Sequence, residues 1–381
     1  MFLFVQPFYV LPAGLPQPGD ALLLPLAPIV LHGWDRRLSP GALRVLKSLA
    51  QFTAWVAIVD YAWVVLLGNW KVTGVDGMLL FPLYYVYNLI LVFLALVLYR
   101  RFGDLFLRVT LLVVLGLVVL LVASSFVMPN ASLRGALFFA NPNQLGYHAL
   151  LSGCIIALTQ RRLGIGAVPT AIGLTGCAYL AILSASRSSV AGLAVLIVLV
   201  VFSNLRVIVL GSLAAVLALQ VGGPLADGLA ASEQRFRNHQ LPHLSFFEQR
   251  GYDRIANNKQ YLVFGAGEGG YTRFAETTAI GAGEIHSSAA MLLFSYGVVG
   301  VAMFCLFLWN LIRRSRLRVA LMLVPPLLYT FAHQGLRFSM LWVLVAVFIS
   351  VKGSPEAGEF RRTQARPRGP HLDRSPLSEA T

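Results

Sequence analysis

The chain has 381 residues, of which 57% are hydrophobic and only 12% are charged, and its mean hydropathy is +0.73. These values exceed those of soluble domains and predict a polytopic membrane protein. The formal net charge of +14 could indicate a nucleic-acid-binding protein. Cytoplasmic loops of membrane proteins are rich in Lys and Arg, which orient the helices and contact anionic headgroups, and this explains most of the excess positive charge. We therefore expect membrane lipids, and no nucleic acid, as partners.

Taken in chain order, the apolar runs predict an all-α bundle of about 12 membrane-spanning helices, because a bilayer core requires roughly 20 apolar residues per helix. Two early segments, 1–13 and 21–32, are short and interrupted by prolines. They form two tilted or re-entrant helices or one irregular span, which makes the count 12 or 11. The start lacks the features of a removable signal peptide, so we expect these segments to be retained. The ten later runs are 49–68, 78–99, 106–127, 141–159, 168–184, 188–203, 206–222, 286–312, 319–334 and 336–351.

The distribution of Lys and Arg predicts the orientation of the bundle. If the C-terminal tail is cytoplasmic, 20 of the 30 Lys and Arg residues lie on the cytoplasmic side, and the bias alternates correctly through every loop. The one long loop, 223–285, then lies outside. We therefore divide the chain into a membrane domain, 1–351, and a basic tail, 352–381, whose Pro, Arg and Ser content predicts disorder.

The three cysteines, Cys154, Cys177 and Cys305, lie inside predicted spans, where packing is their expected role. No two histidines have the H-x-x-x-H spacing of a metal site on a helix. We therefore expect neither a disulfide nor a bound metal.

Among the ten Lys and Arg residues that remain on the outer side, four arginines stand out. Arg134 lies in SLRGALFFANPNQLG, Arg187 in LSASRSSVAG, and Arg250 and Arg254 in FFEQRGYDRIANNKQ. Arg187 joins two apolar runs through a short connection, so it must lie near membrane depth, where a charge is costly unless it is paired or faces a polar cavity. One such arginine could simply extend to the outer headgroups. The set together favours an anion-binding site.

His286 stands where the outer loop meets an apolar run, in EIHSSAAMLLFSYGVVGV. A lone histidine at a helix boundary is more often an interfacial structural residue than a catalyst. In the first turn of a helix, however, the positive end of the helix dipole and nearby arginines would favour a neutral ring that can accept a proton. His286 is therefore a candidate general base beside an arginine cluster, a combination that His148, His239, His243 and His333 lack.

The outer loop also contains the glycine-dense stretch FGAGEGGYTRF, 264–274. It does not match the phosphate-binding G-x-x-x-x-G-K-[ST] loop, so tight turns are its expected role. With six Lys or Arg against seven Asp or Glu, the whole loop is predicted to be a folded element that could cap a cavity between helices.

Several stretches resemble those of the O-antigen polymerase and O-antigen ligase superfamily, bacterial integral membrane glycosyltransferases that act on undecaprenyl-diphosphate-linked glycans at the periplasmic face. RGALFFANPNQLGYHAL resembles the family's Arg-x-x-Gly and Asn-Pro-Asn signature, although Arg134 and Gly135 are adjacent here, and SASRSS resembles its Ser-x-Ser-Arg turn. HSSAAMLLFSYGVVGV fits the ligase-type pattern of His, a small polar residue, nine residues, Gly, two residues, Gly and a β-branched residue. RGYDRI to FGAGEGGY resembles the family's arginine-containing loop segment, with Arg250 or Arg254 as the equivalent arginine.

The resemblance implies transfer of a glycan from an undecaprenyl-diphosphate carrier onto a sugar hydroxyl at the periplasmic side of the bacterial inner membrane. His286 would act as the base, and Arg187 with Arg250 or Arg254 would stabilise the diphosphate. Arg134, Asn141 and Asn143 would bind substrate. The displacement would invert the α-linked donor and would need no nucleotide sugar, metal or other cofactor.

Three alternatives stay open at this point. We favour a polymerase that joins repeat units of an exopolysaccharide, capsule or O-antigen, working beside a flippase and a chain-length regulator. A ligase would transfer the glycan to lipid A core or to protein, as in lipopolysaccharide synthesis. A transporter of polysaccharide or lipid-linked sugar would also be all-helical with buried arginines, but a long outer loop with one histidine at its exit is less expected there.

Overall fold

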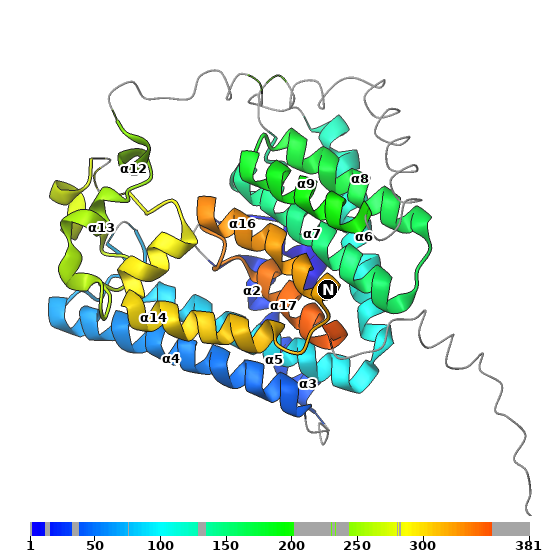
Figure 1. Ribbon diagram of the computed structural model, residues 1–381, viewed down its shortest axis with the longest axis horizontal. Coiled ribbons are helices and arrows are strands. Elements are labelled where there is room, and N and C mark those ends of the chain that lie inside the picture. Colours follow the sequence, from blue (N-terminus) through cyan, green and yellow to red (C-terminus); the bar gives the residue numbers. More distant parts are fainter. Residues whose placement is uncertain are drawn as a thin grey trace, which may run out of the picture.

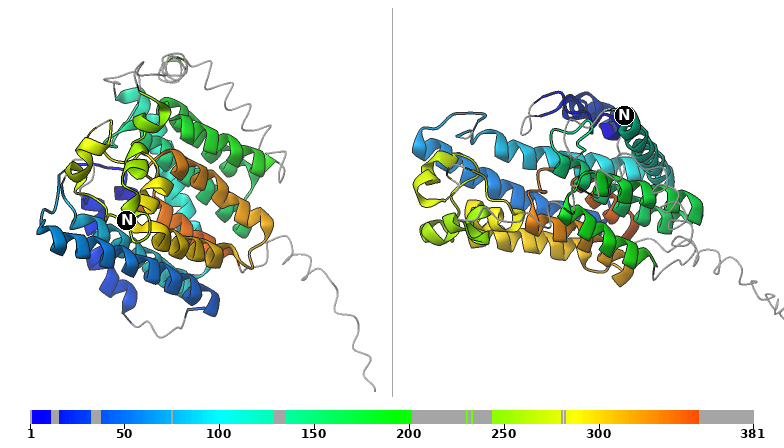
Figure 2. Two further views of the ribbon diagram at one scale, coloured as in Figure 1. Left: turned by 60° about the vertical axis from the view of Figure 1, so that its left-hand side comes forward. Right: turned by 90° about the horizontal axis from the view of Figure 1, so that it is seen from above.

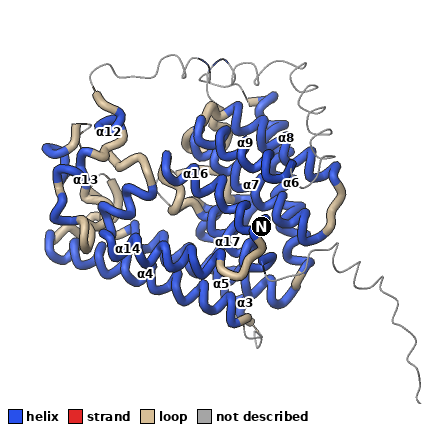
Figure 3. The backbone as a smooth tube through the Cα atoms, in the orientation of Figure 1, coloured by secondary structure: helices blue, strands red, loops and turns tan. Residues whose placement is uncertain are grey.

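The computed structural model describes residues 2–11, 16–32, 38–74, 76–128, 135–201, 230, 233, 244–279, 281 and 283–352. Within these ranges the chain forms helices, turns and loops and contains no strand, which confirms the predicted all-α class (Figure 3). Three predicted features lie outside the described residues: Arg134, the span 206–222 and the tail from 353 onward.

The helices follow one another along the chain in the order shown in Figure 1. The N-terminal ones are α1 (Phe2–Val5), α2 (Pro18–Ala21) and α3 (Leu23–Leu31). The long ones are α4 (Pro40–Leu67), α5 (Leu80–Phe102), α6 (Asp104–Val127), α7 (Pro142–Leu163), α8 (Ala167–Leu183) and α9 (Arg187–Val201). The outer loop holds α12 (Phe246–Gln249), α13 (Asp253–Asn257), η1 (Lys259–Tyr261) and η2 (Tyr271–Thr277). The last are α14 (Ser288–Ile312), α15 (Leu317–Ala320), η3 (Leu321–Leu323), α16 (Val324–Ala332) and α17 (Ser339–Lys352).

Several of these helices are apolar enough to cross a membrane. Among the described residues, α4, α5, α6 and α14 have both the length and the hydropathy of a membrane span. Five further apolar helical segments of 10–17 residues are shorter. The predicted count of 11 or 12 crossings therefore stays a prediction.

The helices α7 and α17 lie at the centre of the bundle. Every residue of Leu145–Thr159 in α7 and of Ser339–Val351 in α17 is buried. Figure 1 shows α17 between α5 and α7, and α7 packs in turn on α6, α8 and α9. Because protein surrounds α7, its polar residues His148 and Ser152 need not face lipid, which explains why α7 is less apolar than its neighbours.

Helix α4 begins nine residues before the predicted span, whereas α7 begins within one residue of its prediction. The Ser39 side chain accepts a hydrogen bond from the Ala42 N–H (3.2 Å), and Pro40 occupies the first turn of α4. Asn141 caps α7 in the same way through the Gln144 N–H (3.1 Å). The hydropathy pattern missed the start of α4 because its first turns carry Arg44 and Lys47.

The basic connections gather at one end of the bundle, which we call the basic end. The Arg161 guanidinium donates to the Arg318 carbonyl (3.0 Å), and Arg162 pairs with Asp104 (3.0 Å). The Lys352 ammonium donates to the Leu311 carbonyl (2.9 Å). These contacts join the α5–α6, α7–α8 and α14–α15 connections and the end of α17.

The opposite end, which we call the loop end, carries the α4–α5 and α8–α9 connections, the outer loop and the connection 333–338 between α16 and α17. Figures 1 and 2 show the short helices of the outer loop gathered where α4 ends and α14 begins, with α4 and α14 side by side. The two groups of loops separated by their charge in the sequence therefore lie at opposite ends of the bundle.

Candidate functional site

The outer loop packs into a break in α14. Gly297 has φ +67° and ψ −176°, which is not helical, and the Val298 N–H donates to the Leu262 carbonyl of the loop (2.7 Å). A Cβ atom on Gly297 would collide with the Val263 carbonyl, and one on Gly265 would collide with the Ser295 carbonyl. Only glycine permits this close approach of two backbones. The first glycine of the ligase-type pattern and the glycine-dense loop therefore form one contact.

This contact buries two carboxyl groups between α4, α14 and the loop. Glu268 and Asp60 are both fully buried, and the Glu268 N–H donates to Asp60 Oδ1 (2.7 Å). The Tyr296 hydroxyl donates to Glu268 Oε2 (2.7 Å) and also lies 3.3 Å from Asp60 Oδ2. Burial raises the pKa of the Glu268 carboxyl above its usual value, and the Arg337 guanidinium opposes part of that shift. Buried carboxyl groups of this kind are costly, so their presence in the bundle indicates a function or a conformational role.

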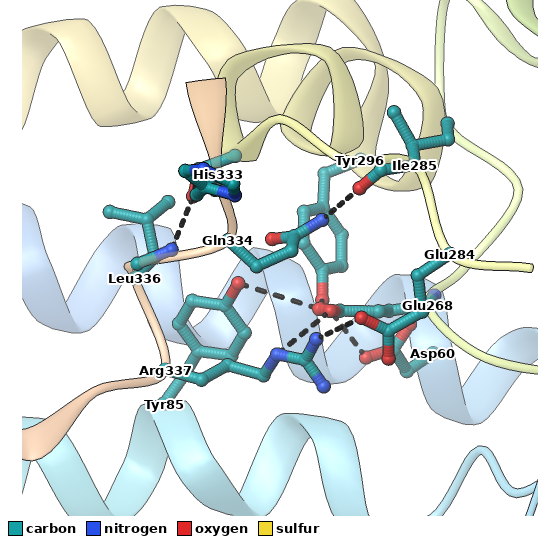
Figure 4. A network of polar contacts seen from close by, with 12 residues as sticks. Asp60, Tyr85, Glu268, Glu284, Ile285, Tyr296, His333, Gln334, Leu336 and Arg337 are labelled. Carbon is teal, nitrogen blue, oxygen red and sulfur yellow. Dashed lines mark hydrogen bonds and ion pairs between the residues drawn. The ribbon is translucent and has the colours of Figure 1, made fainter. Parts of the chain in front are cut away.

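Arg337 lies between a buried and a half-exposed carboxylate (Figure 4). Its Nε is 3.4 Å from Glu268 Oε1, and its Nη2 is 2.9 Å from Glu284 Oε2. Burial alone would lower the pKa of the Arg337 guanidinium, but the carboxylates of Glu284 and Glu268 hold it well above its usual range. Arg337 therefore stays charged and fixes the connection 333–338 to the outer loop.

The same connection contacts the start of α14 through hydrogen bonds. The Gln334 side-chain amide donates to the Ile285 carbonyl (2.6 Å), as Figure 4 shows. The Ser288 hydroxyl accepts from the Gly335 N–H (2.8 Å) and donates to the His333 carbonyl (3.1 Å). The residues on both sides of His286 are thus held by one connection.

His286 is exposed and lies just before α14. The N-cap of α14 is Ser287, whose hydroxyl accepts from the Ala290 N–H (3.3 Å), so His286 is not in the first turn where we predicted it. Because Ser287 is the cap, α14 begins at Ser288, two residues after the start of the predicted run 286–312. The His286 Nδ1 lies 2.8 Å from the Glu284 carbonyl oxygen. Since a carbonyl oxygen only accepts, Nδ1 carries the proton, and in the neutral ring the lone pair is on Nε2.

Arg250 is the neighbour of His286. The His286 N–H donates to the Arg250 carbonyl (3.1 Å), so the two backbones run side by side. The half-buried Arg250 guanidinium donates to the carbonyl of Ala332 at the end of α16 and lies 5.5 Å from the centre of the Phe246 ring. A cation and a potential base therefore lie together at the loop end.

Arg254 occupies a different environment. It is fully buried, and its guanidinium donates to Thr278 Oγ1 (3.2 Å) and to the Gly283 carbonyl. The rings of Tyr271 and Phe274 lie 5.4 Å from its guanidinium carbon. These contacts hold the outer loop together, so Arg250 and not Arg254 is placed beside His286.

The predicted residues Arg187, Asn141 and Asn143 form a second group at the loop end. Arg187 is the first residue of α9, after a turn in which Ala185 has φ +47°. This turn presses on the start of α7, because a Cβ atom on Gly146 would lie 2.5 Å from Ser184 Oγ. The second group therefore joins the SASRSS turn to the Asn-Pro-Asn helix start.

Helix α16 connects the two groups. The Tyr329 hydroxyl donates to the Asn143 carbonyl (3.2 Å), and the Tyr329 ring stacks on Tyr147 of α7 at 4.0 Å. Three residues further along α16, the Ala332 carbonyl accepts from Arg250. One short helix thus contacts both predicted arginine groups.

The sequence analysis missed Asp60, Glu268, Glu284 and Arg337. Two of them carried a signal that could have been used. Asp60 is a carboxylate inside an apolar run, and Arg337 is a cation at the start of the predicted run 336–351, on the outer side and against the charge bias. Glu268 and Glu284 look like ordinary loop acids in the sequence, and only the fold brings them to Arg337.

Comparison with known proteins does not identify the chain: no family model matches it, and no curated protein is similar to it. Among the described residues, no group of three or more His, Cys, Asp or Glu side chains could hold a metal ion.

Proposed function

We propose that the protein is a membrane glycosyltransferase that moves a glycan from an undecaprenyl-diphosphate carrier onto a sugar hydroxyl at the outer face of the bacterial inner membrane. The observation that carries this proposal is the backbone contact between His286 and Arg250: it brings an imidazole whose lone pair is on Nε2 and an arginine onto adjacent segments, just before an apolar helix begins. The motif resemblance adds the substrate class.

In the proposed reaction, the acceptor hydroxyl attacks the anomeric carbon of the donor sugar. The bond from that carbon to the diphosphate oxygen breaks, and the diphosphate leaves on its lipid carrier. His286 Nε2 takes the proton of the acceptor hydroxyl. Arg250, with Arg187 and the predicted Arg134, binds the diphosphate and stabilises the charge that develops on it. Attack opposite the leaving group inverts the anomeric configuration.

Polymerisation of repeat units is our preferred form of this reaction. Transfer to lipid A core or to protein would use the same residues with another acceptor. Incubating the purified protein with lipid-diphosphate oligosaccharide, with and without lipid A core, separates the two. Products that lengthen by whole repeat units without added core support a polymerase, and products formed only with core support a ligase.

The buried network of Asp60, Glu268 and Arg337 favours one different candidate function. Ionisable groups inside a helical bundle are typical of transporters and proton relays. A transporter of lipid-linked sugar would move labelled substrate across a proteoliposome membrane without forming a new glycosidic bond. Bond formation that depends on His286, in detergent and without a membrane potential, would exclude this candidate.

A further inference from the structure

The segment 284–286 is held by an ion pair that sequence motifs do not mark. We propose that Glu284 and Arg337 are positioning residues that hold His286 with Nδ1 protonated and Nε2 facing outward. This inference rests on the proposed function for the role of Nε2, but the arrangement itself is a property of the fold.

The ion pair is anchored deep in the protein. Arg337 Nε lies 3.4 Å from the fully buried Glu268, whose N–H and Oε2 are held by Asp60 (2.7 Å) and Tyr296 (2.7 Å). The Arg337 guanidinium also lies 5.0 Å from the centre of the Phe81 ring. Arg337 is thus fixed on one side by α4, α14 and the loop, and on the other side it holds Glu284 (2.9 Å).

Glu284 transmits this anchor to His286. Its side chain binds Arg337, while its carbonyl oxygen accepts from His286 Nδ1 (2.8 Å). Gln334 donates to the next carbonyl, that of Ile285 (2.6 Å), and the His286 N–H donates to the Arg250 backbone carbonyl (3.1 Å). The backbone on both sides of the imidazole is fixed, so the ring is presented in one orientation and one tautomer.

The local charge argues against a direct role of Arg337 in binding the diphosphate. Its positive charge already faces two carboxylates, Glu268 and Glu284, whereas within the described residues the Arg250 guanidinium contacts the Ala332 carbonyl and the Phe246 ring. The carboxylates of Glu268 and Glu284 would repel a dianionic leaving group, whereas the Arg250 guanidinium would attract it. Arg337 therefore acts through Glu284.

Glu284→Ala is the informative variant, because it leaves the buried Arg337–Glu268 pair intact. We expect the turnover number of glycan transfer to fall about 10- to 100-fold while the KM for the donor stays unchanged, since a base that is displaced loses rate and the arginines still hold the diphosphate. Glu284→Gln can still accept from Arg337 and should restore part of the rate. Lys71→Ala is the matched control, because it removes an exposed ion pair with Asp76 at the same end of the bundle. A rise in KM with unchanged turnover in Glu284→Ala would overturn the proposal.

A second measurement does not depend on any enzymatic activity. Diethyl pyrocarbonate modifies neutral imidazoles, and peptide mass spectrometry reports the rate at each histidine. With the ring released from its fixed orientation in Glu284→Ala, His286 should react roughly 3- to 10-fold faster, the equivalent of one lost hydrogen bond. The exposed His32 near the other end should not change. Equal modification rates of His286 in Glu284→Ala and in the parent would disprove the positioning role, whether or not the protein has transferase activity. A faster rate in Glu284→Ala together with a parent that transfers no glycan would support the positioning role and disprove the proposed function.

Discussion

At the residue scale, substitutions of His286 distinguish a general base from a structural residue. A structural histidine makes a hydrogen bond that glutamine can replace, but glutamine has no basic nitrogen near neutral pH. We therefore expect both His286→Ala and His286→Gln to lower turnover by about 10²- to 10⁴-fold, with donor binding retained. The measurement is steady-state transfer with a defined lipid-diphosphate donor and acceptor. Near-parental turnover of the glutamine variant would leave His286 as an anchor.

The two loop arginines should behave differently although they are only four residues apart. Arg250→Ala removes a half-buried cation beside His286 and is expected to raise the KM for the donor without a change in thermal stability. Arg254→Ala removes a fully buried guanidinium and leaves a cavity among aromatic rings, so it should lower the unfolding temperature by several degrees, equivalent to about 2–5 kcal/mol. Thermal unfolding and donor titration of the same two preparations test this contrast, and the reverse pattern would exchange the two roles.

The buried Glu268 predicts a dependence of stability on pH. Its pKa is raised in the folded protein, so the folded state keeps this proton to higher pH than the unfolded state does. Stability from this group is therefore fully present below its ordinary pKa of about 4.3 and is lost as pH rises through the raised value. Compared with Glu268→Gln, the parent should lose unfolding temperature across that window. A parent that gains stability over the variant as pH rises would mean that the attraction of Arg337 outweighs the cost of burial.

Much of the residue-level site was predictable because a charge at the wrong membrane side is visible in the sequence. Arg187 and Arg250 were found in this way, His286 was found because it stands where the outer loop meets an apolar run, and the fold places all three at the loop end. Which of Arg250 and Arg254 lies beside His286 was not predictable, because both lie in one polar segment and only their tertiary contacts differ. The partners of Arg337 come from positions 268 and 284, far from it in the chain, and no local pattern joins them.

At the scale of elements, the break in α14 could be located from the glycines but not understood from them. The apolar run predicts one continuous helix, and the helix does extend to Ile312. The apolar run gives no sign that the backbone of the outer loop packs against α14 at Gly297. The starts of α4 and α7 were likewise set by side-chain caps, whereas hydropathy alone marks only where apolar residues begin.

Gly297→Ala should therefore detach the outer loop. Its φ of +67° is unfavourable for alanine, and the added methyl group would collide with the Val263 carbonyl. We expect a loss of about 2–4 kcal/mol in stability and faster proteolysis within 244–279. Gly116→Ala is the matched control, since Gly116 lies in α6 with no atom near the added methyl group, and it should be neutral or slightly stabilising. Equal protease resistance of the two variants would show that the contact at Gly297 does not hold the loop.

At the scale of the whole molecule, the charge partition and the fold agree on which connections lie together, and the remaining question is which end faces the cytoplasm. The positive-inside rule assigns the basic end to the cytoplasm and the loop end to the outside. Single cysteines at exposed positions of each end test this assignment after Cys305, the exposed native cysteine, is replaced by serine. Glu276→Cys lies in the outer loop, and Leu317→Cys lies at the basic end. In intact spheroplasts a membrane-impermeant maleimide should label position 276 and not 317, and both should be labelled after lysis. Labelling of position 317 alone would show that the orientation is the reverse of the one assigned. It would also contradict a site at the outer face, because His286 and Arg250 lie at the same end of the bundle as position 276.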